Sequence, residues 1–220
     1  MAMRAALQPL PLGVRYAAAR VESALEAALA AARDGVAAAE DAQGGLWERF
    51  MGELPKPLTS TLRLGGRAMA PTFNRGPPGG DPEMLVVRKM PRPSLSTIFS
   101  GDVVAFRTAD GRGTLVRRVA AVEGDEMVSS CAEDEPFCIP RDHCWVLADN
   151  ADLPTKEATD SRTFGPLPVE RILGRVVYSC RSAVDHGAVE NSESANVEDQ
   201  PVLSYELDIE TLFSAGEGEK

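Results

Sequence analysis

The chain has 220 residues, which is room for one domain with extensions. Hydrophobic residues make up 44% of it and charged residues 25%, a globular composition that excludes a wholly disordered or fibrous protein. The formal net charge is −10. Because the chain also lacks a dense stripe of lysine and arginine, we do not expect it to bind nucleic acid.

The N-terminal part is predicted to be helical. Before Glu22, the first acidic residue, the chain is rich in alanine and leucine and its charged residues are Arg4, Arg15 and Arg20, which suits an organellar targeting segment over residues 1–21. The same region also fits a surface helix, because Val21, Leu25 and Leu29 recur at four-residue spacing. We expect a helical extension and connector over residues 15–58.

No run of apolar residues is long enough to span a bilayer, because charged residues interrupt the alanine-rich stretch. Membrane contact would therefore be peripheral. It would come through a partner protein or through Trp47 and Phe50 of the connector.

Residues 59–182 are predicted to form an all-β domain with long loops. Glycine and proline punctuate short segments rich in Val, Leu and Ile. The expected strands cover residues 61–64, 84–87, 102–107, 113–122, 144–147 and 171–178. Residues 74–82 include three glycines and three prolines. Such a segment cannot form a helix or a central strand, so it is predicted to be a loop.

Residues 183–220 form an acidic tail. They carry ten Asp or Glu and Lys220 as the only Lys or Arg, a composition typical of disorder. Within the tail, residues 201–213 alternate apolar and acidic side chains. This segment is interpreted either as a docking segment for a partner or as a strand or short helix lying on its own domain.

The four cysteines are too few for a disulfide scaffold and form no CxxC pair, so neither a metal site nor a cofactor is expected. Cys131 and Cys138 bracket residues 132–137 and could close that loop by a disulfide in an oxidising compartment. Reduced thiols are the alternative.

Three motifs follow one another along the β domain. The first is Gly-Gly-Arg-Ala-Met-Ala-Pro-Thr-Phe at residues 65–73. The second comprises Gly-Asp at 101–102, Leu-Val-Arg-Arg-Val at 115–119 and Gly-Asp at 124–125. The third comprises Ala-Asp-Asn at 148–150 and Asp-Ser-Arg-Thr-Phe-Gly-Pro at 160–166.

Together these motifs resemble the signal peptidase I family, and most closely its mitochondrial inner membrane protease subunits. The resemblance implies an antiparallel β fold over about residues 59–180. It also implies that Ala68 stands where the family has its serine nucleophile and Arg117 where it has its lysine base. The third motif departs from the family pattern, with Ala148 in place of glycine and a longer spacing between Asp149 and Asp160.

Those two positions lack the family's chemistry. Alanine has no hydroxyl that could be acylated, and arginine stays protonated where a lysine with a lowered pKa could act as a base. We expect Arg117 to form a structural ion pair with a carboxylate such as Asp160 or Asp102.

The other motif residues are expected to serve as scaffold. They are Met69, Pro71, Thr72, Gly101, Asp102, Arg118, Gly124, Asp125, Asp149, Asn150, Asp160, Ser161, Arg162, Gly165 and Pro166. A displaced catalytic pair would have to come from other residues. The candidate hydroxyls are Thr72, Ser94, Ser96 and Ser161, with His143 or Lys89 as a base.

The sequence thus predicts a catalytically silent relative that acts as a structural or binding subunit of an organellar membrane-associated processing or import assembly. Its partners would be proteins, and its peptide groove could still capture presequence peptides by strand addition. The alternative is an active serine endopeptidase with a displaced dyad. The expected location is the mitochondrion, peripheral to the inner membrane, with a plastid as the alternative.

Overall fold

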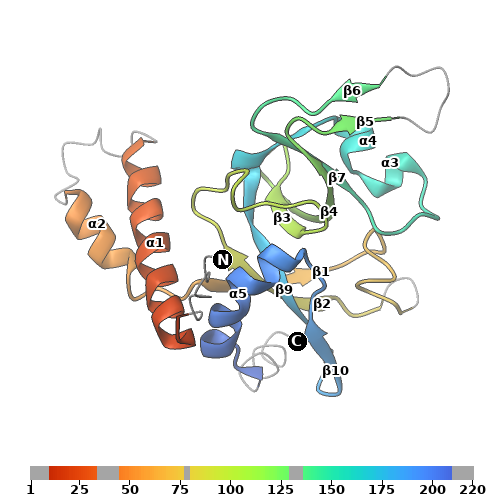
Figure 1. The fold of residues 1–220 in the computed structure, drawn as a ribbon. Coiled ribbons are helices and arrows are strands. Elements are labelled where there is room, and N and C mark those ends of the chain that lie inside the picture. Colours follow the sequence, from red (N-terminus) through yellow and green to blue (C-terminus); the bar gives the residue numbers. More distant parts are fainter. Residues whose placement is uncertain (1–9, 34–44, 77–79, 129–135, 210–220) are drawn as a thin grey trace, which may run out of the picture.

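The computed structural model describes residues 10–33, 45–76, 80–128 and 136–209. A curled antiparallel sheet forms the body, and helices cover one side of it (Figure 1). The predicted mainly antiparallel β domain with N-terminal helices is confirmed. Among the described residues, no helix is long and apolar enough to cross a membrane.

The main sheet has the order β1-β2-β9-β3-β4-β7-β8, with β10 paired to β9. Its strands are β1 (Thr59–Leu64), β2 (Glu83–Lys89), β3 (Val103–Arg107), β4 (Thr114–Val122), β7 (His143–Leu147), β8 (Leu167–Pro168), β9 (Ile172–Ser182) and β10 (Asp185–Ala188). All neighbouring pairs are antiparallel. Six of these strands match the six predicted segments within a few residues, because each is an apolar run bounded by turn residues.

Short elements fill the connections. A small second sheet pairs β5 (Glu126–Met127) with β6 (Phe137–Cys138). The helices α3 (Thr155–Ala158) and α4 (Ser161–Phe164) and a 3-10 turn (Val169–Arg171) lie between β7 and β9.

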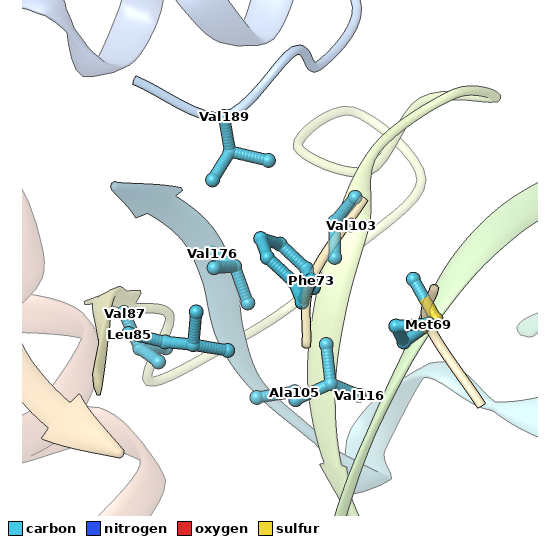
Figure 2. Packing of buried hydrophobic residues seen from close by; sticks show 9 residues of the cluster. All are labelled: Met69, Phe73, Leu85, Val87, Val103, Ala105, Val116, Val176 and Val189. Carbon is cyan, nitrogen blue, oxygen red and sulfur yellow. The ribbon is translucent and has the colours of Figure 1, made fainter. Parts of the chain in front are cut away.

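Alternation along the strands divides the core into two layers. Val103 and Ala105 of β3 face one cluster, which also holds Met69 and Phe73 (Figure 2). The intervening residues Val104 and Phe106 face a second cluster, on the other side of the sheet. The sheet is therefore buried on both faces at its centre.

The helical side consists of α1 (Leu12–Arg33), α2 (Leu46–Glu53) and α5 (Glu193–Glu206). Helix α1 buries small residues, Ser23, Ala24 and Ala28. The apolar residues Val21, Leu25 and Leu29, whose spacing predicted the helix, are 49%, 44% and 36% exposed. The close approach of α1 to its neighbours is therefore made by its alanine face.

The expectation of a disordered tail from residue 183 is wrong for residues 185–206, which form β10 and α5. Helix α5 starts at the N-cap Ser192, whose hydroxyl accepts a hydrogen bond from the Ala195 amide. Val202 is fully buried, and Leu203 packs on the sheet. Composition suggested disorder, but these few apolar residues and the buried carboxylate Asp199 anchor the helix to the domain.

Glu206, at the end of α5, ties three elements together. Its carboxylate accepts hydrogen bonds from the Leu58 amide, the Thr59 amide and hydroxyl, and the Tyr16 hydroxyl, at 2.8 to 2.9 Å. Tyr16 also stacks on Tyr205 at a ring-centroid distance of 4.8 Å. Burial favours a raised pKa for Glu206, but these hydrogen bonds lower its pKa below the ordinary value.

Candidate functional site

The first motif forms a loop after β1. Met69 and Phe73, both 1% exposed, insert into the core cluster (Figure 2). Between them the Ala70–Pro71 peptide bond is cis. These two anchors hold the loop on the sheet and leave Ala68 half-buried at its start.

The third motif fastens this loop. The Asn150 amide donates to the Ala68 carbonyl at 3.0 Å, and the Asn150 side chain donates to the Arg67 carbonyl at 2.9 Å. The Thr72 hydroxyl donates to the Asp149 carboxylate at 2.5 Å. Two segments nearly eighty positions apart in the sequence are thus held together at the backbone of Ala68.

Arg118 connects the second motif to the same point. Its guanidinium binds both oxygens of Asp149, with Nε to Oδ1 at 3.0 Å and Nη2 to Oδ2 at 2.8 Å. Its Nη1 donates to the Gly101 and Glu190 carbonyls. The structure therefore brings all three sequence motifs into one site.

Arg117 lies on the opposite face of β4 from Val116, which belongs to the cluster of Met69. It is 4% exposed, and its guanidinium donates to the carbonyls of Val116 and Ala158. Its Nε has no hydrogen-bond partner among the described residues. Burial lowers the pKa of Arg117, and Asp160 partly offsets this shift.

The expected ion pair of Arg117 with Asp160 or Asp102 is not formed. Asp160 is instead bound by Arg162 at 2.7 Å, and Asp102 by Arg175 at 2.9 Å. The buried guanidinium of Arg117 is therefore bound by backbone carbonyls through its two Nη atoms, while its Nε has no partner among the described residues. The sequence could not distinguish these pairings, because the side-chain directions that decide them are set by the packing of the folded chain.

Asp160 and its neighbours hold the loop before β8 in place. The Asp160 carboxylate caps α4 through the Arg162 amide and also accepts from the Ala148 amide, both at 3.0 Å. Ser161 accepts from the Val146 amide at 2.9 Å. Burial opposes ionisation of Asp160, but the Arg162 side chain and the amide hydrogen bonds lower its pKa.

The remaining motif residues shape turns. Gly101, Gly124 and Gly165 have φ angles of 96°, 83° and 81°, in the left-handed region that favours glycine. Gly165 ends α4 and is followed by Pro166. The Asp125 carboxylate closes the turn after β4 by accepting from the Val122 amide.

Asp102 belongs to a buried ionic cluster that the sequence did not indicate. Arg175 binds Asp102, Glu198 and Asp199 at 2.9, 2.9 and 2.6 Å. Burial alone would lower the pKa of Arg175, but these carboxylates raise it above its ordinary value. No local motif marks the cluster, because its members come from the β3 entry, β9 and α5.

The candidate residues for a displaced dyad are not brought together. Thr72 and Ser161 are engaged with Asp149 and the Val146 amide, and Ser94 is hydrogen-bonded to Ser96. Within the described residues, none of these hydroxyls is hydrogen-bonded to Lys89 or His143. Burial lowers the pKa of Lys89, but, among the described residues, its amine forms no hydrogen bond with any of the four candidate hydroxyls.

Cys138 is an exposed free thiol, and its suggested disulfide partner Cys131 lies outside the described residues. Cys144 is buried, and burial raises the pKa of its thiol to about 12, so it is chemically inert. No group of three or more His, Cys, Asp or Glu in the described parts of the chain is placed to hold a metal ion.

A groove of about 560 Å³ opens at one end of the core. Its walls include Leu62, Val87 and Ala105, which also belong to or pack against the cluster of Met69. The groove therefore lies on the same face of the sheet as the anchor of the Ala68 loop.

Comparison with known proteins decides the family. The chain is 44% identical over 148 residues to the Arabidopsis thaliana mitochondrial ATP-independent inner membrane protease subunit 2, covering 67% of this chain and 70% of that protein. The chain belongs to the family of mitochondrial inner membrane protease subunits, within the signal peptidase I family. This confirms the resemblance drawn from the three motifs.

More distant relatives also match, one from the inner membrane proteases and one from chloroplasts. Mouse mitochondrial inner membrane protease subunit 1 is 30% identical over 99 residues, which cover 43% of this chain and 57% of that protein. The Arabidopsis chloroplastic thylakoidal processing peptidase 1 is 24% identical over 148 residues, covering 56% and 41%. No family model matches the chain.

Proposed function

We propose that this chain is a catalytically silent member of the inner membrane protease family that acts as a structural or binding subunit of a processing or import assembly. The observation that carries the proposal is the pair of residues at the motif site. Ala68 offers no hydroxyl, and the buried guanidinium of Arg117 is tied to two carbonyls. Nucleophile and base act as a unit, so their joint loss removes the reaction.

The retained scaffold supports a binding role. Asn150, Asp149 and Arg118 still hold the loop of Ala68 through charge-assisted and backbone hydrogen bonds. The groove of Leu62, Val87 and Ala105, on the same face of the sheet, would then bind an extended peptide, such as a presequence, without cleaving it. The expected signature is affinity without turnover.

The family relationship supports a place at the mitochondrial inner membrane. The relatives named above are subunits of inner membrane proteases, so protein partners are the natural ligands of such a chain. We propose peripheral association of this protein with that membrane through a partner subunit. A plastid location has weaker support, from the 24% identical thylakoidal relative.

The test is cleavage of a presequence peptide, followed by mass spectrometry. The wild-type protein is compared with the double variant Ala68→Ser/Arg117→Lys, which supplies the family's two catalytic groups. Ala70→Ser/Arg117→Lys is the matched control, because it places the hydroxyl two positions away in the same loop. We expect no cleavage by the wild type or the control.

Cleavage by the wild type at constant specific activity through successive purification steps would refute the proposal. In that case the alternative, an endopeptidase with a displaced dyad, would hold. Alanine substitution of Thr72, Ser94, Ser96 and Ser161 in turn would then identify the nucleophile. Cleavage by the Ala68→Ser/Arg117→Lys variant alone would show that the site keeps its geometry and lacks only the reacting groups.

A further inference from the structure

A second cleft lies between the β3–β4 hairpin and α4. It encloses about 530 Å³. Its apolar surface comes from Phe106, Leu115, Phe164 and Leu167. Phe164 is 40% exposed, and its ring meets that of Phe106 edge-on at a centroid distance of 6.0 Å. The cleft thus exposes an aromatic side chain that rests on a rigid, buried neighbour.

Three arginines surround this apolar surface: Arg107, Arg112 and Arg171. None of them forms an ion pair with another residue in the described parts of the chain. The carboxylate in the lining, Asp110, accepts hydrogen bonds from the Thr108 hydroxyl and the Arg112 amide within the hairpin turn. Unpaired cations therefore gather around an apolar cleft in a chain whose net charge is −10.

We propose that this cleft binds an acidic segment of a partner protein in which one large apolar side chain is flanked by carboxylates. The apolar surface would bury that side chain, which is the usual anchor of such interfaces. The guanidinium groups would bind the flanking carboxylates, for which their planar geometry is suited. Charge complementarity thus selects the partner.

A lipid surface fits the cleft less well. A bilayer of anionic lipids would bring many negative charges against Asp110 as well as against the arginines. The polar rim formed by Thr108, Asp110 and Thr159 also limits the apolar opening, which suits one inserted side chain. A peptide is therefore the occupant that the charges and the shape favour.

The probe is a set of fluorescent eight-residue peptides with a central Leu, Phe or Trp between glutamates, and a matched set with lysines. Binding to the full chain is measured by fluorescence anisotropy. The test variants are Arg112→Glu/Arg171→Glu for the rim, because these arginines line this cleft and not the groove of Leu62 and Val87, and Phe164→Ala for the apolar surface. Arg33→Glu/Arg141→Glu is the control, because it makes the same charge change at exposed arginines outside the cleft.

We expect at least one glutamate peptide to bind, the rim variant to weaken its binding at least tenfold, and Phe164→Ala to weaken it severalfold. The control variant and the lysine peptides distinguish binding at the cleft from a general effect of charge. Failure of every glutamate peptide at millimolar concentration, or equal binding to the rim variant and the wild type, would overturn the proposal. The proposal would also be overturned if the wild type bound phosphatidylglycerol vesicles but no peptide, and if the rim variant no longer bound those vesicles.

The inference rests on the proposed subunit role but not on the loss of catalysis. Peptide cleavage is assayed on the wild type and on variants of residues 68, 70 and 117, and none of the cleft variants changes these residues. A failed anisotropy experiment would therefore leave the silent-peptidase proposal standing, and the reverse also holds.

Discussion

Arg175 is the residue whose loss should do most damage to this fold. Its side chain is 1% exposed and is surrounded by Asp102, Asp199 and Glu198, of which the first two are 0% and 4% exposed. Asp199 and Glu198 belong to α5, whereas Arg175 belongs to β9. The cluster therefore fixes the C-terminal helix to the centre of the sheet.

Replacing Arg175 with methionine would leave the buried Asp102 without a cation and would leave Asp199 only the more distant Arg88, at 4.0 Å. Removal of one partner from a buried ion pair costs about 3–5 kcal/mol, and the whole unfolding free energy of a domain is only about 5–15 kcal/mol. We expect the Arg175→Met variant to lose about 3–5 kcal/mol, enough to unfold a marginal domain.

Urea unfolding followed by circular dichroism measures this loss. Lys56→Met is the control, because its ion pair with Glu53 has a lysine that is 57% exposed and such pairs contribute about 0–1 kcal/mol. The double variant Arg175→Met/Asp102→Asn should recover part of the stability by removing the stranded charge of Asp102, while Asp199 keeps its contact with Arg88. A loss below about 1 kcal/mol for Arg175→Met would refute the assignment of the cluster as a buried network.

Three further predictions concern stability and the site. The pKa of Glu206 is lower in the folded protein than its unfolded-state value of about 4.5. The ionised carboxylate therefore stabilises the fold fully above pH 4.5, and this stabilisation is lost as the pH falls through the lower folded-state pKa. Glu206→Gln should make the fall of Tm in that acid range less steep. Gly174→Ala should prevent folding, because a Cβ would lie 2.1 Å from a backbone oxygen, whereas Gly187→Ala meets open space and should be tolerated in a thermal melt. Arg118→Met should leave Asp149 with fewer partners and cost about 1.5–3 kcal/mol in urea unfolding; an unchanged midpoint would contradict the tie between the motifs.

The strands of the β domain were predictable because their signals are local. Segments such as 114–122 are runs of apolar and β-branched residues bounded by glycine, and the structure places β4 there. The family was predictable for a similar reason, since the three motifs keep their order and residue types. The roles of the motif residues in catalysis or support remain predictions.

The chemistry at residues 68 and 117 also followed from the sequence, because a missing hydroxyl and a permanent charge are properties of the residue type. The hydrogen-bond partners of Arg117, in contrast, could not be predicted from the sequence. Only the packing of the folded chain decides that Arg162 binds Asp160 and that Arg175 binds Asp102.

Only the tertiary structure shows that part of the C-terminal region folds into a helix. Composition favours disorder over residues 183–220, since acidic residues dominate and apolar ones are few. In the folded chain, however, Val202 is buried, Asp199 meets Arg175, and Glu206 binds the start of β1. Each contact joins residues that are far apart in the sequence. Amino-acid composition averages over a segment, and it cannot show that three well-placed side chains are enough to order a helix.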